Sequence, residues 1–158
     1  MTPNARPSVR ALWATLLFAF LTTGCDDATG PRAREGLEFL VGDWSADVLV
    51  VTSTADPGQS IDLLEGGSAF RINVQPSGLY TATLTVLGTP VTEIGTLAVE
   101  GTVLTFYREF PSADTATATL TQLSPDRVRL VGSTTFDFEP VGSPDDASLL
   151  TELVRQDS

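Results

Sequence analysis

The chain contains no histidine and no lysine, and Cys25 is its only cysteine. Without histidine it cannot form a Ser-His-Asp triad or a zinc site with histidine ligands. With one cysteine it cannot close a disulfide within the chain, so an exported domain of this sequence is held together by its core alone. We therefore expect a protein that is not an enzyme and that uses no metal and no other cofactor.

Carboxylates and serines are present, but none lies in a catalytic pattern. Asp26-Asp27 and Asp145-Asp146 are adjacent pairs in loop-like segments, where solvated acids are the simpler interpretation. Hydrolytic carboxylates need partly buried, matched positions, and no spacing in this chain marks such a pair. No serine lies in a Gly-x-Ser-x-Gly elbow. Catalysis is therefore not expected.

Positive charge is scarce over most of the chain. Two of the 9 basic residues, Arg6 and Arg10, lie within the first ten positions. From residue 25 onward the chain contains 7 arginines and 20 acidic residues, which gives a formal net charge of −13. A surface of this charge repels phosphate backbones and anionic lipid head groups. We expect no nucleic-acid partner.

The first 24 residues have the parts of a secretory signal. Residues 1–10 carry two arginines and no acid, and an apolar run over 11–21 is followed by small polar residues that lead to Cys25. The apolar run has about half of the roughly 20 residues that a membrane-spanning helix needs. The polar segment that follows, with glycine and proline, is typical of a flexible tether. We predict a signal peptide over 1–24, a tether over 25–35 and a folded domain over 36–158.

Gly24-Cys25, at the end of the apolar run, resembles the lipobox of bacterial lipoproteins, although Thr22 stands where leucine is usual. The resemblance implies cleavage before Cys25, a diacylglyceryl thioether on its sulfur and an acylated new N-terminus, for example with palmitate. Several acyl chains together give stable anchoring. The protein would then be exported and anchored to a cell-envelope membrane, on its periplasmic or outer-membrane face. The alternative is an ordinary cleaved signal with an incidental cysteine.

From residue 36 onward, short runs rich in valine, threonine, leucine and aromatic residues are separated by glycine, proline, aspartate and serine. Within one run, Phe70, Ile72 and Val74 fall on one face while Arg71 and Asn73 fall on the other. One dry face is typical of an antiparallel sheet. We predict a short helical turn around 34–41 and an all-β domain. Eight strands are predicted, near 43–53, 67–75, 78–87, 90–99, 102–110, 114–123, 127–138 and 147–156.

Eight sequential strands with short connections can close as an up-and-down barrel without exposed edges, and we favour this over a sandwich. Gly42-Asp43-Trp44 resembles the Gly-x-Trp signature of the lipocalins and the wider calycin superfamily, whereas the superfamily's Thr-Asp-Tyr stretch is not found. The resemblance implies a lipocalin-like barrel in which Gly42 and Trp44 lie at the closed end. It also implies that Arg155, from the last strand, lies over the indole of Trp44.

The predicted inward faces mix large and small residues. Small residues can leave a cavity, and Phe70, Tyr80, Phe106 and Phe136 are the candidate wall for a small apolar ligand. If large residues instead fill the space opposite small ones, the core is solid and dry. Two functions stay open: a lipid-anchored, lipocalin-like protein of the cell envelope that binds a small hydrophobic ligand, or a non-enzymatic structural or protein-interaction module with a filled core.

Overall fold

The computed structural model describes residues 35–86, 88–138 and 144–157. These residues form one 3₁₀ helix, Glu38–Leu40, and nine strands. The strands are β1 (Gly42–Ser53), β2 (Ser60–Asp62), β3 (Ala69–Val74), β4 (Leu79–Val86), β5 (Thr89–Glu100), β6 (Val103–Phe110), β7 (Asp114–Ser124), β8 (Arg127–Phe136) and β9 (Asp145–Arg155). The eight predicted strands are all present, and their ends differ from the predicted ends by no more than two residues.

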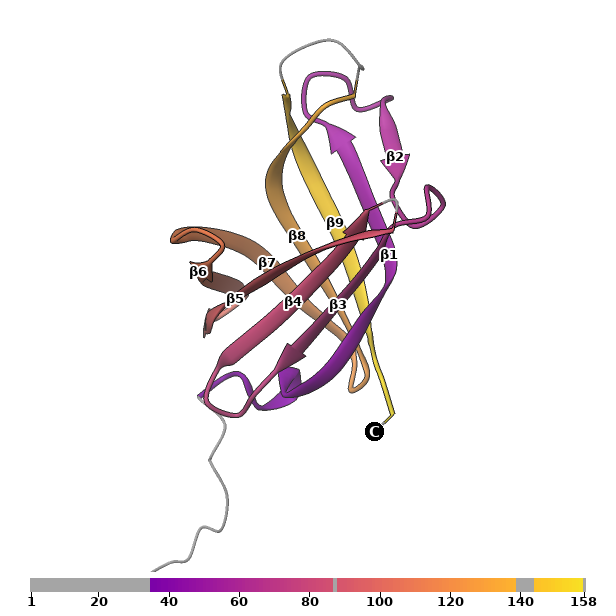
Figure 1. The fold of residues 1–158 in the computed structure, drawn as a ribbon. Coiled ribbons are helices and arrows are strands. Elements are labelled where there is room, and N and C mark those ends of the chain that lie inside the picture. The colour runs from indigo at the N-terminus through magenta and orange to yellow at the C-terminus, as the bar shows by residue number, and fades with distance from the viewer. Residues whose placement is uncertain (1–34, 87, 139–143, 158) are drawn as a thin grey trace, which may run out of the picture.

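The strands close into a barrel. Strands β3 to β9 pair consecutively in antiparallel fashion. Strand β1 pairs with β3 on one side and with β9 on the other, which closes the ring. In this last pairing Trp44 lies opposite Arg155, and Ser53 lies opposite Ala147. Figure 1 shows the last strand, β9, lying between β8 and β1. The predicted closed, eight-stranded antiparallel barrel is confirmed, because a sandwich of two facing sheets would not join its first and last strands.

Strand β2 is an addition to the predicted set and stands outside the ring. It pairs with Val50–Thr52 in the second half of β1, whereas β3 pairs with Gly42–Ser45 in the first half. The two strands therefore share one edge of β1. With three residues, β2 is too short to show a pattern of alternating polar and apolar residues, so its sequence does not predict a strand.

A bulge changes which side chains of β1 face the barrel interior. The register with β9 shifts between Ala46 and Val48, so Asp47 is the extra residue. A bulge moves the following side chains to the opposite face. Leu49 and Val51, which are 3% and 2% exposed, therefore continue the inward row that Trp44 begins.

The largest cluster of buried apolar side chains lies next to the 3₁₀ helix. Leu37 and Leu40 are 0% and 3% exposed and plug this end, while Phe39 packs partly against the core. The predicted helical turn around 34–41 is thus present as one 3₁₀ turn. The core cluster consists of Leu37, Leu40, Trp44, Ile72, Val74, Tyr80, Ala82, Leu97, Leu104, Leu120, Val128, Leu130 and Leu153.

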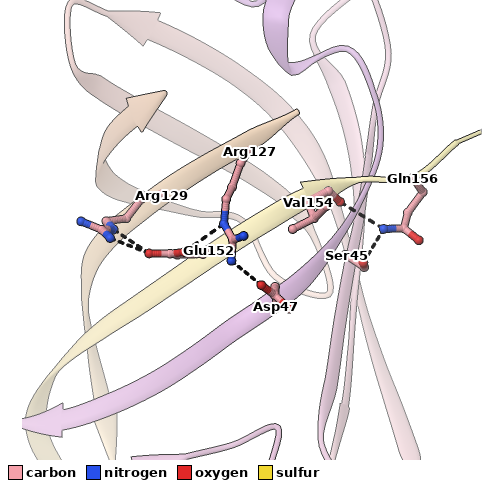
Figure 2. A network of polar contacts seen from close by, with 7 residues as sticks. All are labelled: Ser45, Asp47, Arg127, Arg129, Glu152, Val154 and Gln156. Carbon is pink, nitrogen blue, oxygen red and sulfur yellow. Dashed lines mark hydrogen bonds and ion pairs between the residues drawn. The ribbon is translucent and has the colours of Figure 1, made fainter. Parts of the chain in front are cut away.

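Charged side chains join three strands on the outer wall where the barrel closes (Figure 2). Glu152 of β9 accepts hydrogen bonds from Arg127 Nε at 3.1 Å and from Arg129 Nη2 at 2.6 Å, both on β8. Arg127 also pairs with Asp47 of β1. The hydrogen bond from Arg129, followed by the nearby positive charges, lowers the pKa of Glu152 from its ordinary value of 4.5. This network therefore favours closure at neutral pH.

Candidate functional site

The closed end of the barrel is built around Trp44. Its indole is 1% exposed, and Nε1 donates a hydrogen bond to the Leu40 carbonyl at 2.7 Å. The guanidinium of Arg155 lies over the ring, with Cζ 4.3 Å from the ring centroid. A cation over an indole face is attracted by the electron density of the ring. This contact places the first and last strands of the barrel against each other.

Arg155 also links this closed end of the barrel, which we call the floor, to the segment before β1. Nη1 donates to the Val41 carbonyl at 2.6 Å, and Nη2 donates to the Phe39 carbonyl at 2.7 Å. Gly42 has a φ of 126°, and a Cβ atom placed there would lie 2.8 Å from Arg155 Nη1. Glycine is therefore required at this position both by its backbone angle and by the approach of the guanidinium. The structure thus brings Gly42, Trp44 and Arg155 into one contact group.

The four candidate wall residues occupy inward positions but differ in burial. Tyr80 is 1% exposed and packs edge-on against Phe106, with ring centroids 5.5 Å apart. Phe70 and Phe106 are only partly buried and pack against the edge of the core cluster. Phe136 is partly buried and contacts Phe138 with ring centroids 5.0 Å apart. Tyr80 is therefore part of the core, and the other three lie beyond it.

The end of the barrel opposite the 3₁₀ helix is reached by solvent. On β8, Val128 near the plugged end is 0% exposed and Phe136 at the opposite end is partly exposed, whereas Ser53 and Ala147, at that same opposite end on β1 and β9, are 3% and 1% exposed. Val86 and Val91, at the turn between β4 and β5, are 40% and 55% exposed. Exposed apolar groups that lie together are typical of a surface that contacts another molecule.

A polar cluster that the sequence did not indicate begins at the hydroxyl of the core residue Tyr80. Glu93 Oε2 pairs with Arg108 Nε at 2.8 Å, and Arg108 Nη1 pairs with Asp114 Oδ2 at 3.2 Å. The Tyr80 hydroxyl donates to Glu93 Oε1 at 3.2 Å. The side chains of Glu93 and Arg108 are each 27% exposed, so the pair is largely shielded from water. We call Tyr80, Glu93, Arg108 and Asp114 the inner polar cluster.

The register of four strands assembles the inner polar cluster. Tyr80 lies opposite Gly95, Gly95 opposite Arg108, and Arg108 opposite Asp114, so these residues form one row across β4 to β7. A Cβ atom at Gly95 would overlap the Tyr107 carbonyl oxygen, at the bulge in the pairing of β5 with β6. The missing side chain at position 95 therefore lets β6 approach closely and leaves Tyr80 and Arg108 on either side.

Burial changes the chemistry of Tyr80. Loss of solvent, followed by the negative charge of Glu93, raises the pKa of the Tyr80 hydroxyl far above its ordinary value of 10. The phenol therefore stays protonated at physiological pH and acts as a hydrogen-bond donor to Glu93. Since Glu93 and Asp114 carry two negative charges against one on Arg108, the inner polar cluster has a formal net charge of −1.

Two hollows lie on the outer wall of the described barrel. The larger, of about 440 Å³, is lined by outward side chains of β3 and β4, including Arg71, Asn73 and Thr81, and by the segment after β9. The smaller, of about 290 Å³, lies over β7 and β8, beside Thr117 and Ser133. Both are open to solvent and contain none of the predicted wall residues.

Some sequence predictions concern residues outside the described part of the chain. The signal peptide over 1–24, Cys25 and most of the tether over 25–35 lie there. In residues 35–86, 88–138 and 144–157, no helix is long and apolar enough to cross a membrane. The same residues contain no group of three or more metal-ligating side chains.

Comparisons with known proteins give no family and no curated relative, and they give a partial likeness to a solved structure. No protein-family model matches the chain, and no curated protein matches it. A solved structure, "Structure of EF1p2_mFAP2b bound to DFHBI", is similar with a TM-score of 0.47 and 20% sequence identity, over 75% of this chain and 94% of that chain. The strand pairing defines the class of this protein: a closed, eight-stranded antiparallel β-barrel with one plugged end, an architecture that fits a lipocalin-like barrel.

Proposed function

We propose that this chain is a non-enzymatic, lipid-anchored, lipocalin-like protein of the bacterial cell envelope that binds a small hydrophobic molecule. The ligand site is the open half of the barrel, between Phe70, Phe106 and Phe136. The observation that carries the proposal is the contrast between the two ends. Trp44 is 1% exposed at the floor, whereas these three inward rings remain partly exposed to water.

The physical reason is the free energy of apolar burial. Each square ångström of apolar surface removed from water contributes about 25 cal/mol, so partly exposed inward rings gain stability when an apolar ligand covers them. The barrel backbone is closed by hydrogen bonds on both sides of every ring strand, so the site is held on a rigid scaffold. A preformed site loses little conformational entropy on binding.

The anchoring part of the proposal rests on the N-terminal segment. Gly24-Cys25 resembles a lipobox, and the polar residues between Cys25 and the first described residue, Glu35, are of the kind that form a tether. Lipid on Cys25 would hold the barrel close to a membrane surface, while the net negative charge keeps it from lying on anionic head groups.

The test is native mass spectrometry of the protein purified from its own host, with two neighbouring variants. Phe106→Ala removes an inward ring, and Tyr107→Ala removes the next ring along β6, which is outward and 46% exposed. We expect a bound small molecule in the wild type and in Tyr107→Ala, and at least a tenfold lower occupancy in Phe106→Ala. A wild-type protein with no bound molecule, and no shift of its melting temperature with a panel of apolar molecules, would exclude the carrier function.

The second candidate is a structural or protein-interaction module. It is favoured by apolar side chains on the outer wall of β5 and β6, where Ile94, Tyr107 and Phe110 are 42%, 46% and 55% exposed. Ile94 and Phe110 lie opposite each other in the register. For this function Tyr107→Ala would weaken a cross-link to a partner in the envelope, whereas Phe106→Ala would leave it unchanged.

A further inference from the structure

We infer that one side of the barrel is split between β7 and β8, and that the free edge of β8 in this split pairs with an extended, positively charged segment of a partner protein. The inference goes beyond the proposed ligand-binding function and does not rest on it, because it concerns backbone edges and the outer wall. It follows from the point at which the pairing of β7 with β8 stops and from the backbone groups that lie beyond that point.

The ladder between β7 and β8 covers only part of each strand. Its last pair is Ala118 with Gly132, whereas β7 pairs with β6 as far as Asp114, and β8 pairs with β9 as far as Phe136. Within the described part of the chain, no residue pair joins the facing edges of β7 and β8 beyond Ala118 and Gly132. Figure 1 shows the turn between β6 and β7 well separated from the adjacent ends of β8 and β9. We call the gap between the two facing edges the split.

The register determines which backbone groups of β8 point into the split. The Arg155 amide donates a hydrogen bond to the Asp126 carbonyl at 3.0 Å, in the register that β8 and β9 keep along their whole ladder. In an antiparallel ladder, the backbone groups of successive residues point to opposite edges of the strand. The even-numbered residues of β8 therefore bond to β9, and the backbone amide of Thr135 points into the split.

The two facing edges differ in their free donors. On β7, the Leu120 amide donates to the Thr102 carbonyl at 2.7 Å on the side of β6, so the Thr115 amide points into the split. That amide already donates to Asp114 Oδ1 at 2.7 Å. The Thr135 amide of β8, in contrast, has no acceptor among the residues that the structure describes. An added strand therefore gains more hydrogen bonds along β8 than along β7.

An unpaired strand edge is a template for another strand. A peptide that joins such an edge gains main-chain hydrogen bonds, and the surroundings of its alternate side chains give specificity. The smaller hollow, of about 290 Å³, lies where the split begins. Its lining includes Val103 and Val131, which are 44% and 39% exposed. The side chain of the added strand that lies nearest to this point would cover both valines, so we expect it to be apolar.

Charge selects the partner. Asp146 of β9 lies opposite Thr135, and Asp114 lies across the split with its side chain 60% exposed. The arginine that contacts Asp114, Arg108, is shared with Glu93. Lysine or arginine in the added strand would therefore be attracted by exposed carboxylates on both sides. A second copy of this chain brings a formal net charge of −11 and the same acidic edge, so it is repelled.

The probe is a capped peptide of about ten residues, the length of a long strand, with alternating lysine and valine. It is titrated into the full chain in an isothermal titration calorimeter. One control peptide has glutamate in place of lysine, and another has proline in place of valine, which removes amides that a ladder needs. We expect the lysine–valine peptide to bind about tenfold or more tightly than either control. Added salt should weaken its binding, because the carboxylates are exposed.

Amide hydrogen exchange, followed by nuclear magnetic resonance, locates the peptide. The Thr135 amide should exchange about tenfold more slowly when the peptide is bound, because it gains an acceptor. The Thr134 amide is the internal control, since it points to β9 within an existing ladder. Its exchange should not change.

Three variants test the assignment to β8. Thr135→Pro removes the amide that points into the split and no hydrogen bond to β9, so it should weaken binding about tenfold. Thr115→Pro is the matched control on the facing edge of β7 and should bind as the wild type does. Asp146→Asn leaves the backbone unchanged and should weaken binding of the lysine–valine peptide about threefold. This last variant keeps the test informative if Thr135→Pro does not fold.

Four results would overturn the inference. The first is no binding of the lysine–valine peptide to the wild type, and the second is equal binding of the glutamate peptide. The third is a loss of binding in Thr115→Pro that equals or exceeds the loss in Thr135→Pro. The fourth is protection of the Thr135 amide in the protein alone at high concentration, because a second copy would then occupy the edge. None of these results bears on ligand binding between the inward rings, so the proposed function is tested separately.

Discussion

Replacing Trp44 with alanine tests the floor of the barrel most directly. The indole is 1% exposed, it donates a hydrogen bond to the Leu40 carbonyl at 2.7 Å, and it lies under the guanidinium of Arg155. Removing a buried large aromatic side chain from a core costs about 3–5 kcal/mol. Small domains are stable by about 5–15 kcal/mol, so the variant should fold but unfold at a clearly lower denaturant concentration.

The contribution of the cation over the ring can be isolated with a double-mutant cycle. Arg155→Met keeps an unbranched side chain and removes the charge, together with the hydrogen bonds to the Phe39 and Val41 carbonyls. The free energies of unfolding of Trp44→Ala, Arg155→Met, the double variant and the wild type together give the interaction energy of the pair. We expect about 0.5–2 kcal/mol, the range measured for cation–π pairs from exposed to desolvated sites.

The assay is urea unfolding followed by far-ultraviolet circular dichroism, because this signal reports the strands and does not depend on the fluorescence of Trp44 itself. Trp44→Phe is the control, since it keeps an aromatic ring and loses only the indole hydrogen bond and some volume. A loss below 1 kcal/mol for Trp44→Ala, or an interaction energy of zero for the pair, would refute the assignment of these residues to a packed floor.

Four further variants test other parts of the chain. Gly42→Ala should destabilise the barrel by about 1–3 kcal/mol in the same assay, because φ is 126° and a Cβ would lie 2.8 Å from Arg155. Gly101→Ala, at a positive φ with open space around it, should cost only about 1 kcal/mol. Glu152→Gln should lower the melting temperature at pH 7, and the difference from wild type should vanish in acid. The lowered pKa of Glu152 contributes stability that is complete above pH 4.5, the ordinary pKa of this carboxyl, and that is lost as the pH falls through the lower pKa of the folded state. An equal difference in melting temperature between the variant and the wild type at all pH values would contradict this account. Cys25→Ser should move the protein from the membrane fraction to the soluble fraction, as read by fractionation and immunoblotting; unchanged membrane association would exclude lipid anchoring through this residue.

The ends of the strands could be predicted because alternation and turn residues are local properties. Gln75-Pro76-Ser77-Gly78 and Ser124-Pro125-Asp126 stop one run and start the next, and β3, β4, β7 and β8 end or begin beside them. Closure could be predicted as well, since eight sequential strands with short connections have few other ways to pair all of their edges. The resemblance of Gly42-Asp43-Trp44 to the Gly-x-Trp signature implied which end of the barrel is plugged.

Other features depend on register, which no short stretch of sequence contains. The bulge at Asp47 reverses the inward row of β1, and β2 forms only because the second half of β1 leaves an edge for it.

The inner polar cluster is the clearest case of a property set by the tertiary structure. In the sequence alone, nothing distinguishes Glu93, Arg108 and Asp114 from the many solvent-exposed charged residues of an acidic protein. The sequence determined which residues alternate and where each strand stops, because these follow from local sterics and burial. Only the pairing of β4 to β7 decided that Glu93 and Arg108 meet beside Tyr80 and that Asp114 reaches Arg108, because these contacts require four strands to adopt one register around a closed ring.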